Sequence, residues 1–244
     1  MIKFFRHIRQ NMIQNSRVSR YFIYAIGEII LVVIGILIAL QINEWNETRK
    51  DKLKERAYLS NLKKDIAKDI DFTTGYILER YEKKVEVLKK GRAYYQGTYM
   101  VKDTLDFLND LGYGNVFGNV IWAFNKSTYN QLVNTGDFKV IKSDALTTAI
   151  LDYYGSLNAR ENSGHHKITG YIKFTNSLAP FNREDPEYIS DFDAKFFMSK
   201  INSEEFYRLA NLELTLAHEV KDNAEFINKK AIQLIKRIDR YLND

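Results

Sequence analysis

The feature that most constrains this chain is a run of apolar residues near its N-terminus, residues 21–42, which contains one charged residue, Glu28. A helix rises about 1.5 Å per residue, so about 20 apolar residues cross a hydrocarbon layer roughly 30 Å thick. The Ile, Leu, Val and Phe residues of the run favour insertion by roughly 6 kcal/mol, whereas Glu28 opposes it by up to about 3 kcal/mol. The run therefore predicts a transmembrane helix.

The flanks of the run are typical of an uncleaved signal anchor. Tyr21 and Tyr24 at one end and Trp45 at the other fit the aromatic belts of a membrane span. The run is long for a cleaved signal peptide, and no small-x-small cleavage site follows it. A buried core helix is the alternative, but such helices rarely run this long without an amphipathic pattern.

Charge predicts the orientation of the span. The formal net charge of the chain is +5, and residues 43–244 contribute only about +1 of it. Residues 1–20 contain five basic residues and no acid, and moving them outward opposes an inside-negative potential. We therefore expect a cytoplasmic tail (1–20), a span of the cytoplasmic, or inner, membrane (21–42) and an extracytoplasmic, periplasmic domain (43–244). A near-neutral domain gives no support for a nucleic-acid partner. The five tail residues are Lys3, Arg6, Arg9, Arg17 and Arg20.

The tail itself has two interpretations, which the sequence leaves open. Ile2, Phe4, Phe5, Ile8 and Met12 share one helical face, which is typical of an interfacial helix on an anionic leaflet. The second interpretation is a basic tail that only sets the orientation of the span. In both, the lipid bilayer is the partner of the tail.

One face of the span is polar or small. At 100° per residue, Glu28, Gly35, Ala39 and Asn46 fall close to one line, and small-xxx-small pairs such as Gly35 and Ala39 let two helices approach closely. Three interpretations compete: a protonated Glu28 bonds a partner helix or a second copy of the chain, it extends toward the interface without a special role, or it couples ion movement. The first predicts a homo-oligomer or another membrane protein as partner.

Beyond the span, the apolar spacing predicts an all-α domain that resembles a four-helix bundle. The helix of the span is expected to continue without interruption, apart from a polar turn at Thr73 and Thr74, and to end near Gly91 or Gly97. A capping-box-like start at Asn202 opens a C-terminal helix, whose seam packs antiparallel to the first long helix. That seam comprises Leu216, Val220, Ala224, Ile227, Ala231, Leu234, Ile238 and Tyr241.

The middle of the domain is less regular. We expect a short helix over 104–111, a glycine-rich loop over 112–118, and a helix that Ser127 caps and Gly136 stops. An extended segment or tight connector over 138–141, a helix capped by Ser143 and a helix over 161–178 should follow. The inward residues of the Ser143 helix are Leu146, Ile150, Tyr153 and Leu157.

The chain contains no pattern that predicts catalysis, a metal or a cofactor. It has no cysteine, which excludes disulfides and thiolate chemistry. The glycines of 112–118 do not form a dinucleotide fingerprint. His165 and His166 have no third ligand at a useful spacing, and His218 fits a partly buried or solvated position within the last helix. We therefore expect a protein that is not an enzyme.

A set of aromatic residues lies where the helical pattern is broken. These residues could fill the core at one end of the bundle, or line a groove that binds a ligand or a protein. The candidates for such a binding surface are Tyr113, Phe117, Trp122, Tyr129, Tyr153 and Tyr154.

Two stretches resemble a known family. Residues 24–47, YAIGEIILVVIGILIALQINEWNE, are similar to the N-terminal signature of a domain-of-unknown-function family of single-span membrane proteins from Gram-negative bacteria. Residues 128–154, TYNQLVNTGDFKVIKSDALTTAILDYY, resemble the recurrent middle segment of that family. The resemblance implies a membrane location and a helical extracytoplasmic domain, and it implies no activity.

The leading hypothesis is therefore a membrane-anchored, non-enzymatic interaction or scaffold protein. The alternatives are a ligand-binding, sensor-like periplasmic domain that signals through a partner, and an ion-coupled, stator-like subunit that uses Glu28.

Overall fold

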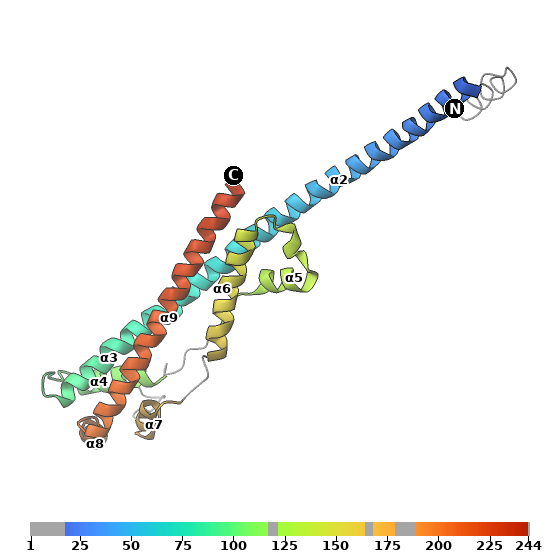
Figure 1. The fold of residues 1–244 in the computed structure, drawn as a ribbon. Helices are drawn as coiled ribbons and strands as arrows, with labels where there is room; N and C mark the ends of the chain where they lie inside the picture. Colours follow the sequence, from blue (N-terminus) through green and yellow to red (C-terminus); the bar gives the residue numbers. More distant parts are fainter. Residues whose placement is uncertain (1–17, 117–121, 164–167, 179–188, 244) are drawn as a thin grey trace. The chain divides into compact units, whose positions relative to one another are not determined.

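The computed structural model describes residues 18–116, 122–163, 168–178 and 189–243, and these are all-helical, with no strand among them (Figure 1). The chain divides into two compact units, Met1–Arg56 and Ala57–Asp244. The tail residues Lys3, Arg6, Arg9 and Arg17 lie outside the described residues. Arg20 lies within the first helix, but its side chain is not described.

One helix contains the whole apolar run. Helix α2 spans Val18–Asp71, which confirms that the helix of residues 21–42 continues without a break. Within it, a window of 18 residues has a mean hydropathy of 2.7, and none of that window is buried. The chain therefore has one helix near its N-terminus that is long and apolar enough to cross a membrane.

The expected turn at Thr73 and Thr74 is wrong, because the chain remains helical there. A π-helix, η1 (Phe72–Leu78), joins α2 to α3 (Glu79–Tyr95). The Thr73 hydroxyl donates to the carbonyl oxygen of Asp69 at 2.8 Å, which keeps the side chain within the helical ladder. A π-segment widens a helix by one residue without ending it.

Of the two glycines expected to end α3, Gly91 and Gly97, only Gly97 does so. Gly97 follows the helix with a φ of 71°, a left-handed conformation that glycine adopts without strain. Gly91 lies inside α3 and is buried. A Cβ atom on Gly91 would lie 2.9 Å from both Leu111 Cδ2 and Phe206 Cζ, so Gly91 permits a close contact instead.

Helix α4 is longer than expected. It spans Thr104–Val116, so Gly112 and Gly114 are helical rather than part of a loop, and Gly118 lies outside the described residues. Burial of Phe107, Leu108 and Leu111 stabilises this helix. That burial offsets the roughly 1 kcal/mol by which glycine disfavours a helix.

The next elements largely follow the sequence pattern. Helix α5 spans Ser127–Thr135 and stops at Gly136, whose φ is 68°, but Lys126 rather than Ser127 occupies the N-cap position. A 3-10 turn, η2 (Asp137–Val140), forms the expected tight connector. Helix α6 spans Asp144–Ser163, and the Ser143 hydroxyl accepts from the Leu146 N–H at 3.2 Å, as expected of a cap. The four predicted inward residues of α6 are all buried.

The expected single helix over 161–178 is wrong. Helix α6 ends at Ser163, and a separate helix, α7 (Gly170–Ser177), begins after Thr169, whose hydroxyl accepts from the Ile172 N–H. A short helix that the sequence analysis did not identify, α8 (Asp191–Ile201), has Ser190 as its N-cap. Both new starts use a Ser or Thr cap, which satisfies backbone N–H groups that a helix terminus leaves unpaired.

Helix α9 (Glu204–Asn243) closes the domain. Its cap is Ser203, whose hydroxyl accepts from the Phe206 N–H, rather than the predicted Asn202. The predicted seam is buried from Ala224 to Ile238, but Leu216 and Val220 are only half-buried, and Ala217 is fully buried in their place.

Helix α9 runs antiparallel to the first helical run of this unit, as predicted. Lys63 pairs with Asp239, Glu82 with Lys221 at 3.4 Å, and Lys84 with Glu213, so rising numbers on one helix meet falling numbers on the other. Two hydrophobic clusters lie along this pair. One joins α9 to η1, α3, α4, α7 and α8, and the other joins it to residues 58–66, α5, η2 and α6.

Candidate functional site

Most of the polar and small face of the span is exposed. Glu28, Gly35 and Ala39 are exposed and Asn46 is half-buried. A Cβ atom on Gly35 would meet nothing within 4 Å. This face, which we call the Glu28–Asn46 face, is therefore open to a second helix at its small positions.

The aromatic candidates are mostly interior. Trp122, Tyr153 and Tyr154 are buried, and the half-buried Tyr129 stacks on Tyr154 with ring centroids 4.3 Å apart. The structure thus places these four in the packing of the domain rather than on an open surface. Phe117 lies outside the described residues, and Tyr113 lies within α4 with a side chain that is not described.

A buried carboxylate, Asp69, joins three segments of the domain. Its Oδ1 accepts from the Asn125 N–H at 2.7 Å, and its Oδ2 accepts from the Tyr153 hydroxyl at 2.9 Å. One turn earlier, Asp65 Oδ2 accepts from the Thr128 N–H at 3.0 Å. The two aspartates therefore accept hydrogen bonds from the backbone just before α5 and in its first turn. Asp69 also accepts one from the side chain of Tyr153 on α6.

Burial sets the ionisation of this group. The pKa of Asp69 is raised to about 6, chiefly by burial and in smaller part by the neighbouring charges of Asp65 and Glu161, against the bonds from Asn125 and Tyr153, which lower it. The same burial raises the pKa of the Tyr153 and Tyr154 hydroxyls, so both stay protonated as donors. The Tyr154 hydroxyl has no hydrogen-bond partner among the described residues.

A second buried carboxylate, Asp137, fixes the C-terminal end of α5. The Tyr58 hydroxyl donates to Asp137 Oδ2 at 2.6 Å, and the Thr135 hydroxyl donates to the same oxygen at 2.7 Å. Asp137 is buried at the start of η2. The turn between α5 and α6 is thereby attached to residue 58 by side-chain bonds.

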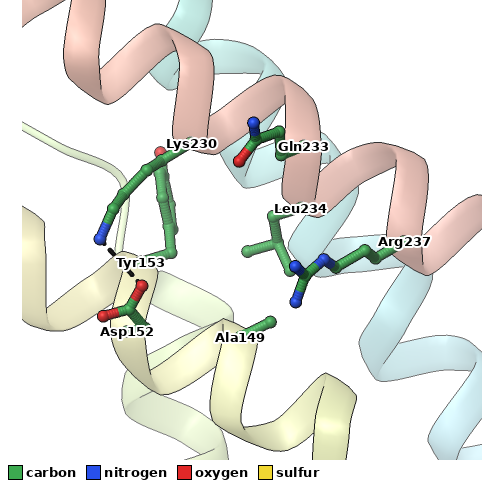
Figure 2. Close-up of a pocket in the computed structure, with 7 residues that line it drawn as sticks. All are labelled: Ala149, Asp152, Tyr153, Lys230, Gln233, Leu234 and Arg237. Atoms are coloured by element: carbon green, nitrogen blue, oxygen red, sulfur yellow. Dashed lines mark hydrogen bonds and ion pairs between the residues drawn. The ribbon is translucent and has the colours of Figure 1, made fainter.

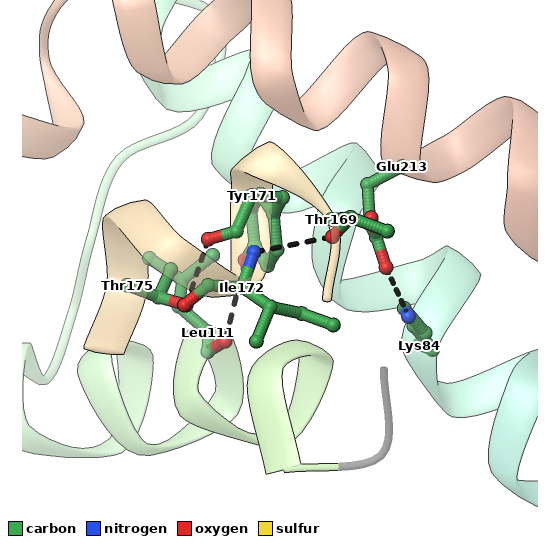
Figure 3. Close-up of polar contacts among 7 residues, drawn as sticks. All are labelled: Lys84, Leu111, Thr169, Tyr171, Ile172, Thr175 and Glu213. Carbon is green, nitrogen blue, oxygen red and sulfur yellow. Dashed lines mark hydrogen bonds and ion pairs between the residues drawn. The ribbon is translucent and has the colours of Figure 1, made fainter. Parts of the chain in front are cut away.

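A buried ion pair joins α3 to α9. Lys84 donates to Glu213 Oε1, and the two side chains are 2% and 1% exposed (Figure 3). Burial lowers the pKa of Lys84, and the Glu213 carboxylate opposes that effect. Nearby, the buried Tyr171 of α7 donates to the Leu111 carbonyl oxygen of α4 at 3.3 Å. These contacts fix how α3, α4, α7 and α9 meet.

A small pocket lies between α6 and α9, where Lys230 of α9 reaches Asp152 of α6 and Arg237 of α9 lies toward Ala149 (Figure 2). Lys230 donates to Asp152 Oδ2 and to the Ser156 hydroxyl, each at 2.8 Å. The lining residues are Ala149, Asp152, Tyr153, Lys230, Gln233, Leu234 and Arg237.

The histidines form no metal site among the residues that the structure describes. His165 and His166 lie outside the described residues, and His218 is exposed on α9. No group of three or more His, Asp or Glu residues among the described positions could hold a metal ion.

Sequence reasoning missed the buried polar residues, although a signal for them was present. Asp65, Asp69 and Lys84 fall at three- or four-residue steps from Leu62, Ile66 and Leu88, so they occupy positions on the apolar face. Charged residues at such positions are buried only when they are paired or hydrogen-bonded. This spacing indicates polar contacts between helices.

Comparison with known proteins places the chain in a family. Residues 28–162 match a family of unknown function, DUF6090. The chain belongs to this family. The match confirms the resemblance seen in the sequence, and it includes the Glu28–Asn46 face, Asp65, Asp69 and helices α4 to α6 almost to the end of α6. No curated protein and no solved structure matches the chain.

Proposed function

We propose that this DUF6090 member is a single-pass protein of the cytoplasmic membrane that holds a helical interaction domain on the periplasmic side. The observation that carries the proposal is the apolar window of α2, which is entirely exposed. Exposed apolar surface of this extent is unfavourable in water and requires lipid or another protein.

The orientation follows from charge. Lys and Arg are balanced across the span, with five in the tail and five in residues 49–56, but the tail contains no acid, whereas acidic residues lie among the downstream basic ones. Moving the tail outward would therefore oppose an inside-negative potential. We class the domain as four-helix-bundle-like, because α9 packs against α3 in one hydrophobic cluster and against α6 in the other, and the shorter α4 and α7 complete the cluster of α3.

We propose association through the span as the molecular role, without catalysis. The Glu28–Asn46 face offers a small pair, Gly35 and Ala39, for close helix contact, and Glu28 as a polar group that a partner helix can shelter from lipid. The partner is a second copy of the chain or another membrane protein. Buried Asp69, Tyr153 and Lys84 form bonds that join helices of the domain, which supports a binding role over a reacting one.

The test is Gly35→Leu in the full-length chain, extracted from native membranes in mild detergent. Leucine should separate the helices and shift most of the protein from a larger complex to the size of the isolated chain on native gels. Gly27→Leu is the matched control, because Gly27 also has nothing within 4 Å but lies about 100° around the helix from the face. An unchanged complex size in Gly35→Leu would remove this role.

A parallel sample with Glu28→Gln separates association from ion coupling. Glutamine keeps hydrogen bonding but cannot exchange a proton. Association should therefore survive this change, whereas an ion-coupled role would be lost.

A further inference from the structure

We infer that the pocket between α6 and α9 binds a small organic carboxylate. This inference goes beyond association through the span and does not depend on it, since every lining residue belongs to the domain that follows residue 56.

The first support is the arrangement of donors along α9. Lys230, Gln233 and Arg237 lie at helical positions i, i+3 and i+7, so they share one face, and Figure 2 shows all three beside the same pocket. Lys230 is held in place by Asp152 and Ser156. The described residues include no hydrogen-bond or ion-pair partner for Gln233 or Arg237. Two donor groups therefore remain for a ligand.

Charge selects the class of ligand. The lining contains two cations, Lys230 and Arg237, and one acid, Asp152, which is already paired with Lys230. A monoanion neutralises the remaining positive charge, and the guanidinium of Arg237 has the planar donor pair that matches a carboxylate.

The floor of the pocket is apolar. Leu234 is 3% exposed and Tyr153 is 1% exposed, and the half-buried Ala149 lies on the α6 side. A short hydrocarbon group can lie on these side chains while its carboxylate meets Arg237 and Gln233 at the rim. Binding sites of this kind combine an apolar lining with a few placed polar groups.

The site also contacts the interior of the domain. Tyr153 forms part of the pocket and donates its hydroxyl to Asp69, so a ligand against the ring touches a residue that joins α6 to α2. The inference thus supplies a ligand class for the sensor-like alternative.

The experiment is a ligand-observed NMR titration of sodium butyrate against the full-length protein in lipid nanodiscs, at constant ionic strength and with empty nanodiscs as blank. Wild type should show saturable binding. Arg237→Gln should weaken it by about tenfold, as expected for loss of one charge-assisted contact. Arg240→Gln removes the same charge from the same helix outside the pocket lining and should leave the affinity unchanged.

A second variant and a second probe complete the test. Ala149→Leu leaves the charges intact but fills the floor of the pocket, so it should also abolish binding. Butyramide, the neutral counterpart of butyrate, should not bind. Absence of saturable binding to wild type, equal affinity in Arg237→Gln, or equal binding of butyramide would each overturn the inference.

Discussion

At the scale of single residues, the most consequential group in the domain is Asp69. It is a carboxylate that is 2% exposed, and the charges that act on it, Asp65 on α2 and Glu161 on α6, are both acidic. Protonation removes the charge from this buried position. The protonated form is therefore favoured in the folded state.

The sign of the resulting pH dependence follows directly. The folded pKa of Asp69, about 6, lies above its ordinary value of 3.8. The stability that this group contributes is therefore fully present below about pH 3.8 and is lost as pH rises through about 6, by at most about 3 kcal/mol. We expect wild type to gain stability relative to Asp69→Asn as pH falls from about 7.5 to about 4.5, because asparagine does not titrate.

The measurement is chemical unfolding of the full-length protein in detergent across this pH range, for wild type and Asp69→Asn. The difference between their free energies of unfolding is the quantity of interest, since it cancels other titrating groups. Thr215→Ser, at an exposed position of α9, is the control and should show a constant difference, because neither side chain titrates in this range. A pH-independent difference for Asp69→Asn would contradict the expectation.

At the scale of helices, we expect the same glycine-to-alanine substitution to change the stability of the domain in opposite directions at two positions. Gly91→Ala should destabilise the domain by about 1–3 kcal/mol, because the added methyl group would lie 2.9 Å from Leu111 and Phe206 in a packed core. Gly155→Ala should stabilise it by about 0.5–1 kcal/mol. Gly155 is exposed within α6, has nothing within 4 Å, and pays the entropic cost of glycine in a helix.

Both variants can be compared by thermal unfolding of the full-length chain under one set of conditions. Equal shifts of the unfolding temperature in the two variants would show that helix propensity alone determines the effect of the substitution. The contact between α3, α4 and α9 at Gly91 would then not be tight.

The same scale shows what sequence could and could not predict. Periodicity predicted the long helix through the apolar run, the Gly136 stop, the inward face of α6 and the antiparallel α9, because burial of one face repeats every three or four residues. It could not predict that the chain stays helical at Thr73, because the Thr73 hydroxyl bonds within the ladder. The seam of α9 was misplaced near Leu216, because Glu213 is buried there beside Leu214 and faces Lys84.

For the candidate sites too, features within one helix could be predicted from the sequence and contacts between helices could not. The Glu28–Asn46 face is a property of one helix, so spacing alone located it. The α6–α9 pocket combines residues about 80 positions apart, and which helices meet is decided by tertiary packing. Its basic residues on α9 carry no local signal that separates them from an ordinary solvated face.

At the scale of the whole molecule, the family match ends before the residues that complete the core. The match covers 28–162, yet α9 supplies residues to both hydrophobic clusters. These residues are Phe206, Ala210, Leu214, Ala217, Ala224, Ile227, Ala231, Leu234 and Ile238.

A chain that ends after residue 203 should therefore fail to form the folded domain. Loss of α9 exposes apolar faces of α3 and α6 and leaves Lys84 without Glu213. Limited proteolysis in detergent should degrade this variant to the apolar N-terminal segment. A chain that ends after residue 240 keeps every buried residue of α9 and should resist. A protease-resistant domain in the shorter chain would show that the family-matched part folds alone.

The antiparallel position of α9 also sets the order of events during biosynthesis. Lys63 and Asp239, which pair across the domain, are 176 positions apart, and α9 is synthesised after the other described helices. Until it emerges, the apolar faces of the earlier helices have no cover and are open to chaperones and to aggregation. Contacts of such long range also form slowly. The domain therefore matures only after α9 has been synthesised, while the apolar part of α2 can engage its environment earlier.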